Sequence, residues 1–262
     1  MEENIFLKCE AHMDGIFTAL YEAFIQKSLL KGDYHENIEI VIGEGDTQNL
    51  FATEIEVQTD NSKAAKLLEA IKRKLGYAIY DTVFHALCHF DSDRATIVFR
   101  YLVRAFAIGS RIAEHLADPY VMRVMELSRK ASHECTKLYG FLRFRDAGDY
   151  LVAKIAPKCD ALPVIVEHFC DRYPNENFLI YDEIRRYTLV HPAYREAFFV
   201  SGENMDNPYM QELDKPDVYE KLWRDYFHTM AIQPRENIRC QNQLLPKWYR
   251  KNMLEFAAGE SL

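Results

Sequence analysis

The chain has 262 residues, enough for one large domain or two modest ones, and it carries a formal net charge of −8. With 48% apolar and 27% charged residues, its composition is that of an ordinary soluble globular protein. The apolar runs are too short for a membrane span, and the first residues lack the basic and apolar regions of a signal peptide. The six cysteines contain no CxxC pair, so reduced thiols, a cytoplasmic location and no membrane contact are expected.

Charge is segregated along the chain. Residues 1–60 hold thirteen acidic and three basic residues, a net charge of −10, and residues 146–218 have a net charge of −7. Two other segments are basic: residues 93–145 have a net charge of +5, and residues 219–253 have a net charge of +4. Basic islands in an acidic chain can localise a polyanion site. Solvated helix faces explain the same pattern, so charge suggests a partner without identifying it.

The first part of the chain combines strand and helix patterns. Strands are expected at residues 4–9, 38–42 and 51–59. Helices are expected at residues 15–30, 62–75, 77–90, 93–116 and 118–139. These elements predict an N-terminal lobe, residues 1–138, in which an acidic strand–helix start and a small sheet are followed by a helical bundle.

The second part of the chain is richer in strands. Strands are expected at residues 141–145, 150–156, 178–182, 185–191 and 194–201. A helix is expected at residues 163–173, and another at 218–230 after a polar loop at 202–217. These elements predict a C-terminal lobe, residues 139–262, in which an antiparallel sheet carries a crossing helix and a basic helical tail. Because strands and helices are segregated and not alternating, the fold class is α+β.

A function can first be argued at Lys137–Arg145, which reads KLYGFLRFR. This stretch is expected to leave the preceding helix at Gly140 and to continue as a strand. In a strand, Phe141, Arg143 and Arg145 share one face. Two arginines and an aromatic ring on one face suit a phosphate, a carboxylate or a base.

Glu134 lies about one helical turn before this predicted strand. We expect its carboxylate to pair with Arg143 or Arg145 and to orient the guanidinium group. A role for Glu134 as a general acid or base, if it is buried, is the alternative.

A second group of polar residues surrounds the expected helix at 163–173. His168 and Arg172 are four residues apart and share a helix face, while Asp182 ends the next strand and Arg185 begins the one after. If they converge on one edge of the sheet, His168 and Asp182 suit acid–base catalysis and the arginines suit phosphate binding. A structural polar cluster is the alternative, because no nucleophile motif accompanies them.

The tail combines basic, aromatic and amide side chains. Arg239, Lys247 and Arg250 alternate with Trp248 and with several asparagines and glutamines. Cations for phosphates, aromatic rings for stacking and amides for base edges are the residues of a nucleic-acid surface. Packing of a C-terminal helix against the body, with Trp248 as its anchor, explains the tail equally well.

His85 and His89 are four residues apart in an expected helix and share a face that could bind a metal. The motif lacks the glutamate of HExxH and a defined third ligand, so a packed or capping histidine pair is the favoured interpretation. No metal or other cofactor is predicted.

Three blocks of this sequence resemble one bacterial family. They are KLYGFLRFR at Lys137–Arg145, HFCDRYP followed by LIYD at residues 168–182, and LWRDYF followed by QNQLLPKWY at residues 222–249. The family is catalogued as probable DNA metabolism protein, a domain of unknown function. Its members typically accompany a radical-SAM protein, and a related domain is fused to some uracil-DNA glycosylases. The resemblance implies DNA processing or repair beside those enzymes. It also implies site candidates at the matching positions: Arg143, Arg145, His168, Arg172, Asp182 and Trp248.

Three hypotheses follow. The first is a nucleic-acid-binding accessory protein in DNA metabolism or repair, which binds single-stranded or damaged DNA and works with a radical-SAM protein or a uracil-DNA glycosylase. The second is an enzyme that acts on a modified base or nucleotide, with His168 and Asp182 as acid and base. The third is a protein-interaction scaffold for the radical-SAM partner.

Overall fold

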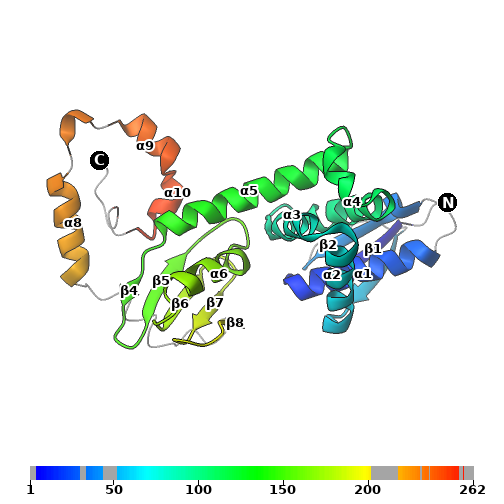
Figure 1. The fold of residues 1–262 in the computed structure, drawn as a ribbon, viewed down its shortest axis with the longest axis horizontal. Helices are drawn as coiled ribbons and strands as arrows, with labels where there is room; N and C mark the ends of the chain where they lie inside the picture. Colours follow the sequence, from blue (N-terminus) through cyan, green and yellow to red (C-terminus); the bar gives the residue numbers. More distant parts are fainter. Residues whose placement is uncertain are drawn as a thin grey trace. The chain divides into compact units, whose positions relative to one another are not determined.

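The computed structural model of the chain describes residues 4–29, 34–43, 52–201, 218–230, 232–235, 237–253 and 256. These residues form an α+β fold, which confirms the expected fold class. The chain divides into two compact units, Met1–Ser132 and His133–Leu262. The division falls inside one continuous helix, α5 (Pro119–Phe141), and the expected boundary after residue 138 falls in the same helix (Figure 1). No helix among the described residues is both long enough and apolar enough to cross a membrane.

Unit 1 is built on a parallel three-stranded sheet in the order β2–β1–β3. Its strands are β1 (Asn4–Cys9), β2 (Ile38–Ile42) and β3 (Ala52–Val57). Alternate residues of β1 face the core, since Ile5, Leu7 and Cys9 are buried and join one cluster. β2 and β3 each pair with β1, so the strands expected on the two sides of Gly43 are not neighbours.

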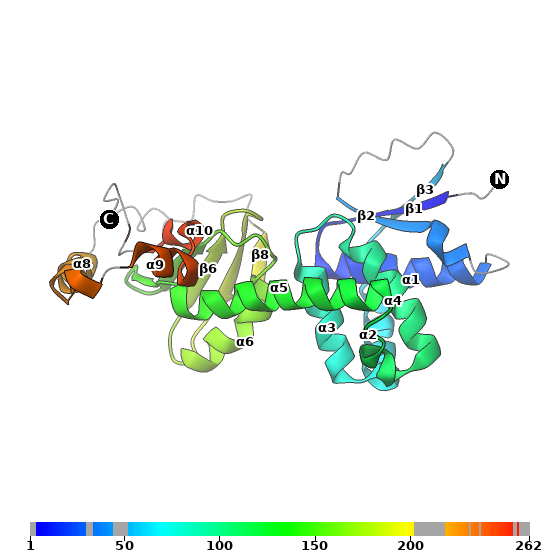
Figure 2. The ribbon, with the colours of Figure 1, turned by 90° about the horizontal axis from the view of Figure 1, so that it is seen from above.

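Helices cover one face of this sheet (Figure 2). They are α1 (Met13–Leu29), α2 (Asn61–Leu75), α3 (Tyr77–Cys88) and α4 (Arg94–Ile108), with 3₁₀ turns η1 (Tyr34–Asn37) and η2 (Ser110–Glu114). A side-chain cap fixes the start of α2: the Oδ1 of Asp60 accepts from the amide of Ser62 over 2.9 Å. The helix expected at 93–116 is shorter than predicted, because Gly109 takes a φ of 88° and ends α4.

Unit 2 is built on a five-stranded sheet in the order β4–β5–β6–β7–β8. The strands are β4 (Arg145–Asp146), β5 (Leu151–Ile155), β6 (Phe178–Asp182), β7 (Tyr187–His191) and β8 (Phe198–Ser201). The helices are α6 (Leu162–Arg172), α8 (Val218–Met230), α9 (Ile238–Leu244) and α10 (Lys247–Arg250), with the 3₁₀ turn η3 (Gln233–Arg235). The expected loop at 202–217 lies outside the described residues.

The sheet of unit 2 is mixed, which corrects the expected antiparallel sheet. β5 and β6 run parallel, with Leu151 opposite Phe178 and Ile155 opposite Asp182, while the other pairs are antiparallel. The reason is α6, which carries the chain back along the sheet so that β6 can start at the same edge as β5.

The strand predicted at 141–145 is also wrong. α5 runs through Gly140 to Phe141, the amide of Leu142 still donates to the carbonyl of Leu138 over 3.0 Å, and only Arg145 and Asp146 belong to a strand. An internal glycine costs a helix about 1 kcal/mol, which the burial of a leucine side chain outweighs. Phe141, Arg143 and Arg145 therefore do not share a strand face.

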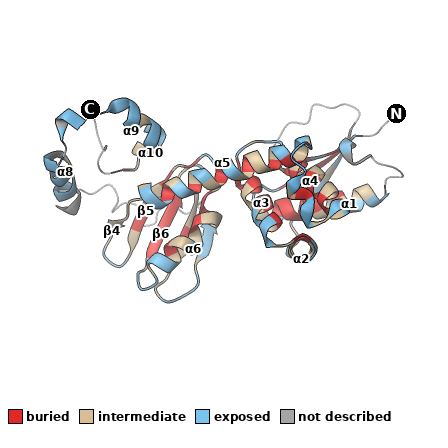
Figure 3. Ribbon diagram, turned by 45° about the horizontal axis from the view of Figure 1, so that its top comes forward, coloured by how far each residue is buried: buried red, intermediate tan, exposed pale blue. Residues whose placement is uncertain are grey.

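The main core of unit 2 lies on one face of its sheet, between β5–β7 and the helices α5 and α6. Buried side chains from all of these elements form one cluster, which includes Leu138, Ile155, Ile165, Phe178 and Leu189. A smaller buried cluster of Val152, Leu179 and Tyr181 lies on the other face. Figure 3 shows β6 buried along its length, whereas α9 is exposed.

Candidate functional site

The carboxyl ends of the parallel strands β5 and β6 meet the C-terminal tail. Trp248 of α10 donates a hydrogen bond from Nε1 to the carbonyl oxygen of Ala156, the residue after β5, over 2.7 Å. Beyond α10, Lys251 and Asn252 bond to the Oε2 of Glu183, the residue after β6, over 3.0 and 3.2 Å. Parallel strands commonly bind ligands at this edge, and here the tail lines it.

A small pocket opens between the end of α5, the end of β5 and α10. Its volume is about 20 Å³, which holds about one water molecule and is far too small to enclose a base. Its lining includes Leu138, Phe141, Lys154, Pro157, Trp248 and Tyr249.

Basic side chains from separate segments surround this pocket. Lys154 of β5 lines it. The Nζ of Lys158 lies 5.7 Å from the ring centre of Trp248, and the Nζ of Lys137 lies 5.5 Å from the ring centre of Tyr249. At these distances each ammonium group is attracted to the aromatic ring beside it.

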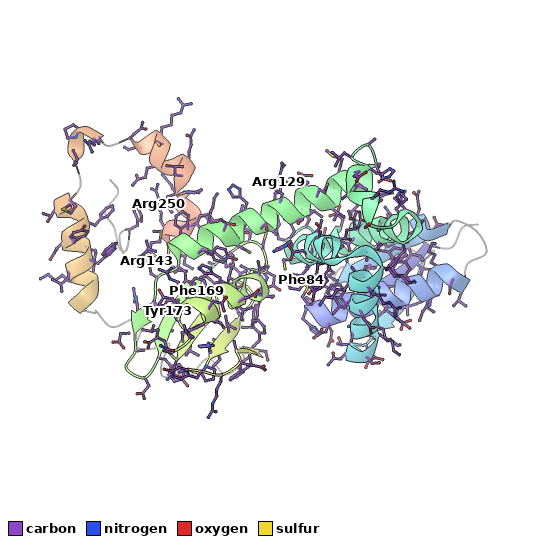
Figure 4. The ribbon with its side chains drawn as sticks, viewed as in Figure 1. Phe84, Arg129, Arg143, Phe169, Tyr173 and Arg250 are labelled. Carbon is purple, nitrogen blue, oxygen red and sulfur yellow. The ribbon has the colours of Figure 1, made fainter. Side chains whose placement is uncertain are left out.

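Two of the predicted cations adjoin pocket-lining residues in the sequence, since Arg143 follows Leu142 and Lys247 precedes Trp248. Arg143 follows the last turn of α5, and its Nη1 donates to the carbonyl oxygens of Gly140 over 2.7 Å and Leu142 over 3.2 Å (Figure 4). A cation is stabilised at the carboxyl end of a helix. Lys247, the first residue of α10, is exposed. We call the following set the basic edge: Lys137, Arg143, Lys154, Lys158, Lys247 and Trp248.

The other tail arginines differ from each other. The Nη2 of Arg250 donates to the Oδ1 of Asn242 over 2.8 Å and to the carbonyl of Leu245 over 3.0 Å, so it holds α9 against α10. Arg239 of α9 is exposed. Of these two predicted phosphate ligands, Arg250 has a structural role and Arg239 faces solvent.

Glu134 supports the loop beneath Trp248. Its two carboxylate oxygens accept from the backbone amides of Lys158 over 3.0 Å and Cys159 over 2.8 Å. These partners differ from the expected pairing with Arg143 or Arg145. Burial, and then the charge of Glu134, raise the pKa of the Cys135 thiol to about 12, so this thiol is protonated at neutral pH and is not a nucleophile.

Asp182 and Arg185 hold the same loop from the other side. The buried carboxylate of Asp182 accepts from the amides of Ile184 and Arg185 and lies 3.0 Å from the Nη1 of Arg185. Arg185 also donates to the carbonyl of Pro157 over 3.3 Å and to that of Lys158. Burial raises the pKa of Asp182, and Arg185 opposes that shift. The pair ties the turn after β6 to the loop after β5.

His168 is not brought to Asp182. Its ring stacks on Tyr139 of α5, with ring centres 4.0 Å apart. Because α6 runs back along the parallel strands, its last turns lie toward the edge where β6 begins, whereas Asp182 ends β6. The expected convergence of these two side chains into one acid–base site is therefore wrong.

Two further predicted arginines have partners outside the basic edge. Arg172 ends α6, and its Nε donates to the hydroxyl of Tyr173 over 3.3 Å. Arg145 starts β4 and pairs with Val152 of β5. Neither lines the pocket beside Trp248.

The two histidines of α3 have local partners. His85 Nδ1 lies 2.9 Å from the carbonyl of Asp81, and the buried His89 Nδ1 accepts from the amide of Asp91 over 3.2 Å. Burial lowers the pKa of His89. Within the described parts of the chain, no three or more His, Cys, Asp or Glu side chains gather to hold a metal ion.

Three members of the basic edge, Lys137, Lys154 and Lys158, are not among the predicted site residues. A signal was present for Lys154 and Lys158, since both lie at or just after the end of β5 and precede α6. Recognising residues 151–182 as a strand–helix–strand unit would have placed them where parallel strands bind ligands.

Comparison with known families gives a match over the second half of the chain and part of the first. The model described as a domain of unknown function, DUF4130, matches residues 92–255, which is more than half of the chain. No curated protein matches the chain.

Proposed function

The chain belongs to the DUF4130 family, and from that premise we propose that it is a nucleic-acid-binding accessory protein of DNA metabolism. The basic edge is the surface we assign to this role. Its partners, by the resemblance described above, are DNA and a radical-SAM protein or a uracil-DNA glycosylase.

One observation carries the proposal. Five basic residues line one small pocket or directly adjoin its lining residues in the sequence, and an exposed tryptophan is one of those lining residues. Lysine and arginine neutralise phosphates and release their counterions, and an aromatic ring accepts a base. The chain as a whole has a net charge of −8, so a polyanion is attracted locally and repelled elsewhere.

The test is a salt-dependent binding measurement. A labelled oligonucleotide is titrated with the protein by fluorescence anisotropy over a series of NaCl concentrations. For single strands the logarithm of the affinity falls with the logarithm of salt by about 0.7 for each phosphate contact. The double variant Lys158→Gln, Lys247→Gln removes two such contacts. We expect it to bind more weakly at low salt and to reduce the slope by about 1.4.

Lys66→Gln is the matched control, because Lys66 is an exposed lysine on α2 of unit 1. Its affinity and slope should equal those of the unchanged protein. The proposal fails if the protein binds DNA no more tightly than an acidic control protein at low salt. It also fails if the double variant behaves like Lys66→Gln.

A further inference from the structure

Trp248 presents a fixed aromatic surface to solvent. The residue is 48% exposed, and its Nε1 donates to the carbonyl of Ala156. The loop that carries this carbonyl is itself fixed, by Glu134 on one side and Arg185 on the other. A ring held in place before binding loses little conformational entropy when a ligand stacks on it.

Cations lie next to this ring. Lys158 has its Nζ 5.7 Å from the ring centre, and Lys247 directly precedes Trp248 in α10. A base on the ring therefore leaves its own phosphates within reach of lysine side chains, which is how proteins bind single strands. Double-stranded DNA does not offer this contact, because the faces of its bases are covered by their neighbours.

Few side chains near Trp248 are placed to recognise the edges of a base. The side chains of three tail asparagines already hold parts of the protein: Asn237 accepts from the amide of Cys240, Asn242 accepts from Arg250, and Asn252 donates to Glu183. The neighbouring pocket of about 20 Å³ does not admit a base. Contact with the ring face alone is tolerant of sequence, since every base has such a face.

We infer that the basic edge takes single-stranded nucleic acid, with one unpaired base stacked on the outer face of Trp248 and little preference for its identity. This inference rests on the proposed function. It adds that the nucleic acid bound is single-stranded and not double-stranded.

Intrinsic fluorescence tests the stacking directly. The full sequence contains two tryptophans, Trp223 and Trp248. The substitution Trp223→Phe therefore leaves Trp248 as the only tryptophan that fluoresces. Three probes are titrated: a short oligothymidylate, the same strand with abasic sites, and a blunt duplex. We expect oligothymidylate to quench Trp248, and the abasic strand and the duplex to bind about tenfold more weakly, since one stacked base contributes about 1.4 kcal/mol.

Variants separate stacking from anchoring. Trp248→Leu removes the ring and is expected to weaken oligothymidylate binding about tenfold, while Trp248→Phe keeps a ring without the N–H donor and retains most of the affinity. Trp223→Phe is the control, because Trp223 is an exposed tryptophan on α8, stacked on Tyr226 and outside the basic edge. Thermal unfolding of each variant reports whether its fold is intact.

The outcomes are distinct. If duplex or abasic strand binds as tightly as oligothymidylate, or if Trp248→Phe loses as much affinity as Trp248→Leu, the stacking inference is overturned while nucleic-acid binding stands. If none of the three probes binds at low salt, the proposed function itself fails.

Discussion

At the scale of single residues, Tyr194 is held in a conformation that bulky residues avoid. It lies in the turn between β7 and β8 with a φ of 61°, and its amide donates to the carbonyl of Pro174 over 2.8 Å. Its side chain is 79% exposed, so little packing offsets the backbone strain. The left-handed conformation costs a residue with a Cβ about 1–2 kcal/mol relative to glycine.

We therefore predict that Tyr194→Gly stabilises the protein. The free energy of unfolding should rise by about 0.5–1 kcal/mol, because relief of the strain exceeds the extra entropy that glycine gives the unfolded chain. Urea denaturation followed by circular dichroism measures it. Tyr77→Gly is the matched control: Tyr77 is 72% exposed at the start of α3, and glycine there should lower stability. A destabilised Tyr194→Gly variant contradicts the prediction.

Also at this scale, several residues expected to contact a ligand contact the protein backbone instead. Glu134 and Arg185 bond to the loop between β5 and α6, and Asp182 bonds to the turn after β6. Their residue types predicted polar, partly buried groups. Their partners were invisible in the sequence, because each lies more than twenty residues away or in a turn whose shape depends on the sheet.

At the scale of one element, α5 carries an ion-pair network on its first half. The Oε1 of Glu126 lies 2.6 Å from the Nζ of Lys130, and its Oε2 lies 2.9 Å from the Nη1 of Arg123. The bond with Lys130, which has the largest effect, and the bond with Arg123 lower the pKa of Glu126 from 4.5 to about 2. Spacings of three and four residues place the three side chains on neighbouring turns.

This network predicts a dependence of stability on acid pH. Between pH 4.5 and about 2 the unfolded chain binds a proton at Glu126 that the folded chain does not. The stabilisation is therefore complete above pH 4.5 and is lost as the pH falls through that window. In urea denaturation at a series of pH values, Glu126→Gln should lose stability less steeply than the unchanged protein.

The control for that measurement is Glu69→Gln, an exposed carboxylate on α2. Its profile should follow that of the unchanged protein. Because the side chain of Glu126 is exposed to solvent, added salt should reduce the difference between the two proteins. Identical profiles for Glu126→Gln and the unchanged protein at low salt contradict the prediction.

The sequence predicted the positions of helices and strands better than it predicted how the strands pair. Most strands and helices lie where the residue pattern placed them, because alternation and caps such as Asp60 act locally. The direction of β6 relative to β5 was missed, since alternation looks the same in a parallel and an antiparallel strand. The sequence predicts a helix end at Gly140, but α5 continues through it because Leu138 packs in the core of unit 2. One of the two interpretations of the tail predicts Trp248 as its anchor. Lys154 is not among the predicted site residues.

At the scale of the whole molecule, the family match starts inside unit 1. It begins at residue 92, just before α4, and leaves out the parallel sheet. Yet α4 depends on that sheet: the hydroxyl of Thr96 accepts from the amide of Ile40 over 2.9 Å, and the buried ring of Phe99 lies 5.3 Å from that of Phe24. The matched residues alone therefore lack part of the core into which α4 packs.

We predict that a fragment of residues 92–262 aggregates, because Phe99 and its neighbours on α4 are exposed to water. A fragment of residues 133–262 keeps every residue of the unit 2 core and should unfold cooperatively. Size-exclusion chromatography and thermal unfolding compare the two. A monomeric, cooperatively unfolding 92–262 fragment, with a fragment 133–262 that fails to fold, reverses the expectation.

The membership of α5 in two cores has a consequence for amide hydrogen exchange. Val121, Val124 and Leu127 belong to the core of unit 1, and Cys135 and Leu138 to that of unit 2. Amides of the first half should exchange when unit 1 opens, and those of the second half when unit 2 opens. A step in protection along α5 would then measure the difference between the opening free energies of the two units within a single helix, and a uniform profile would show that they open together.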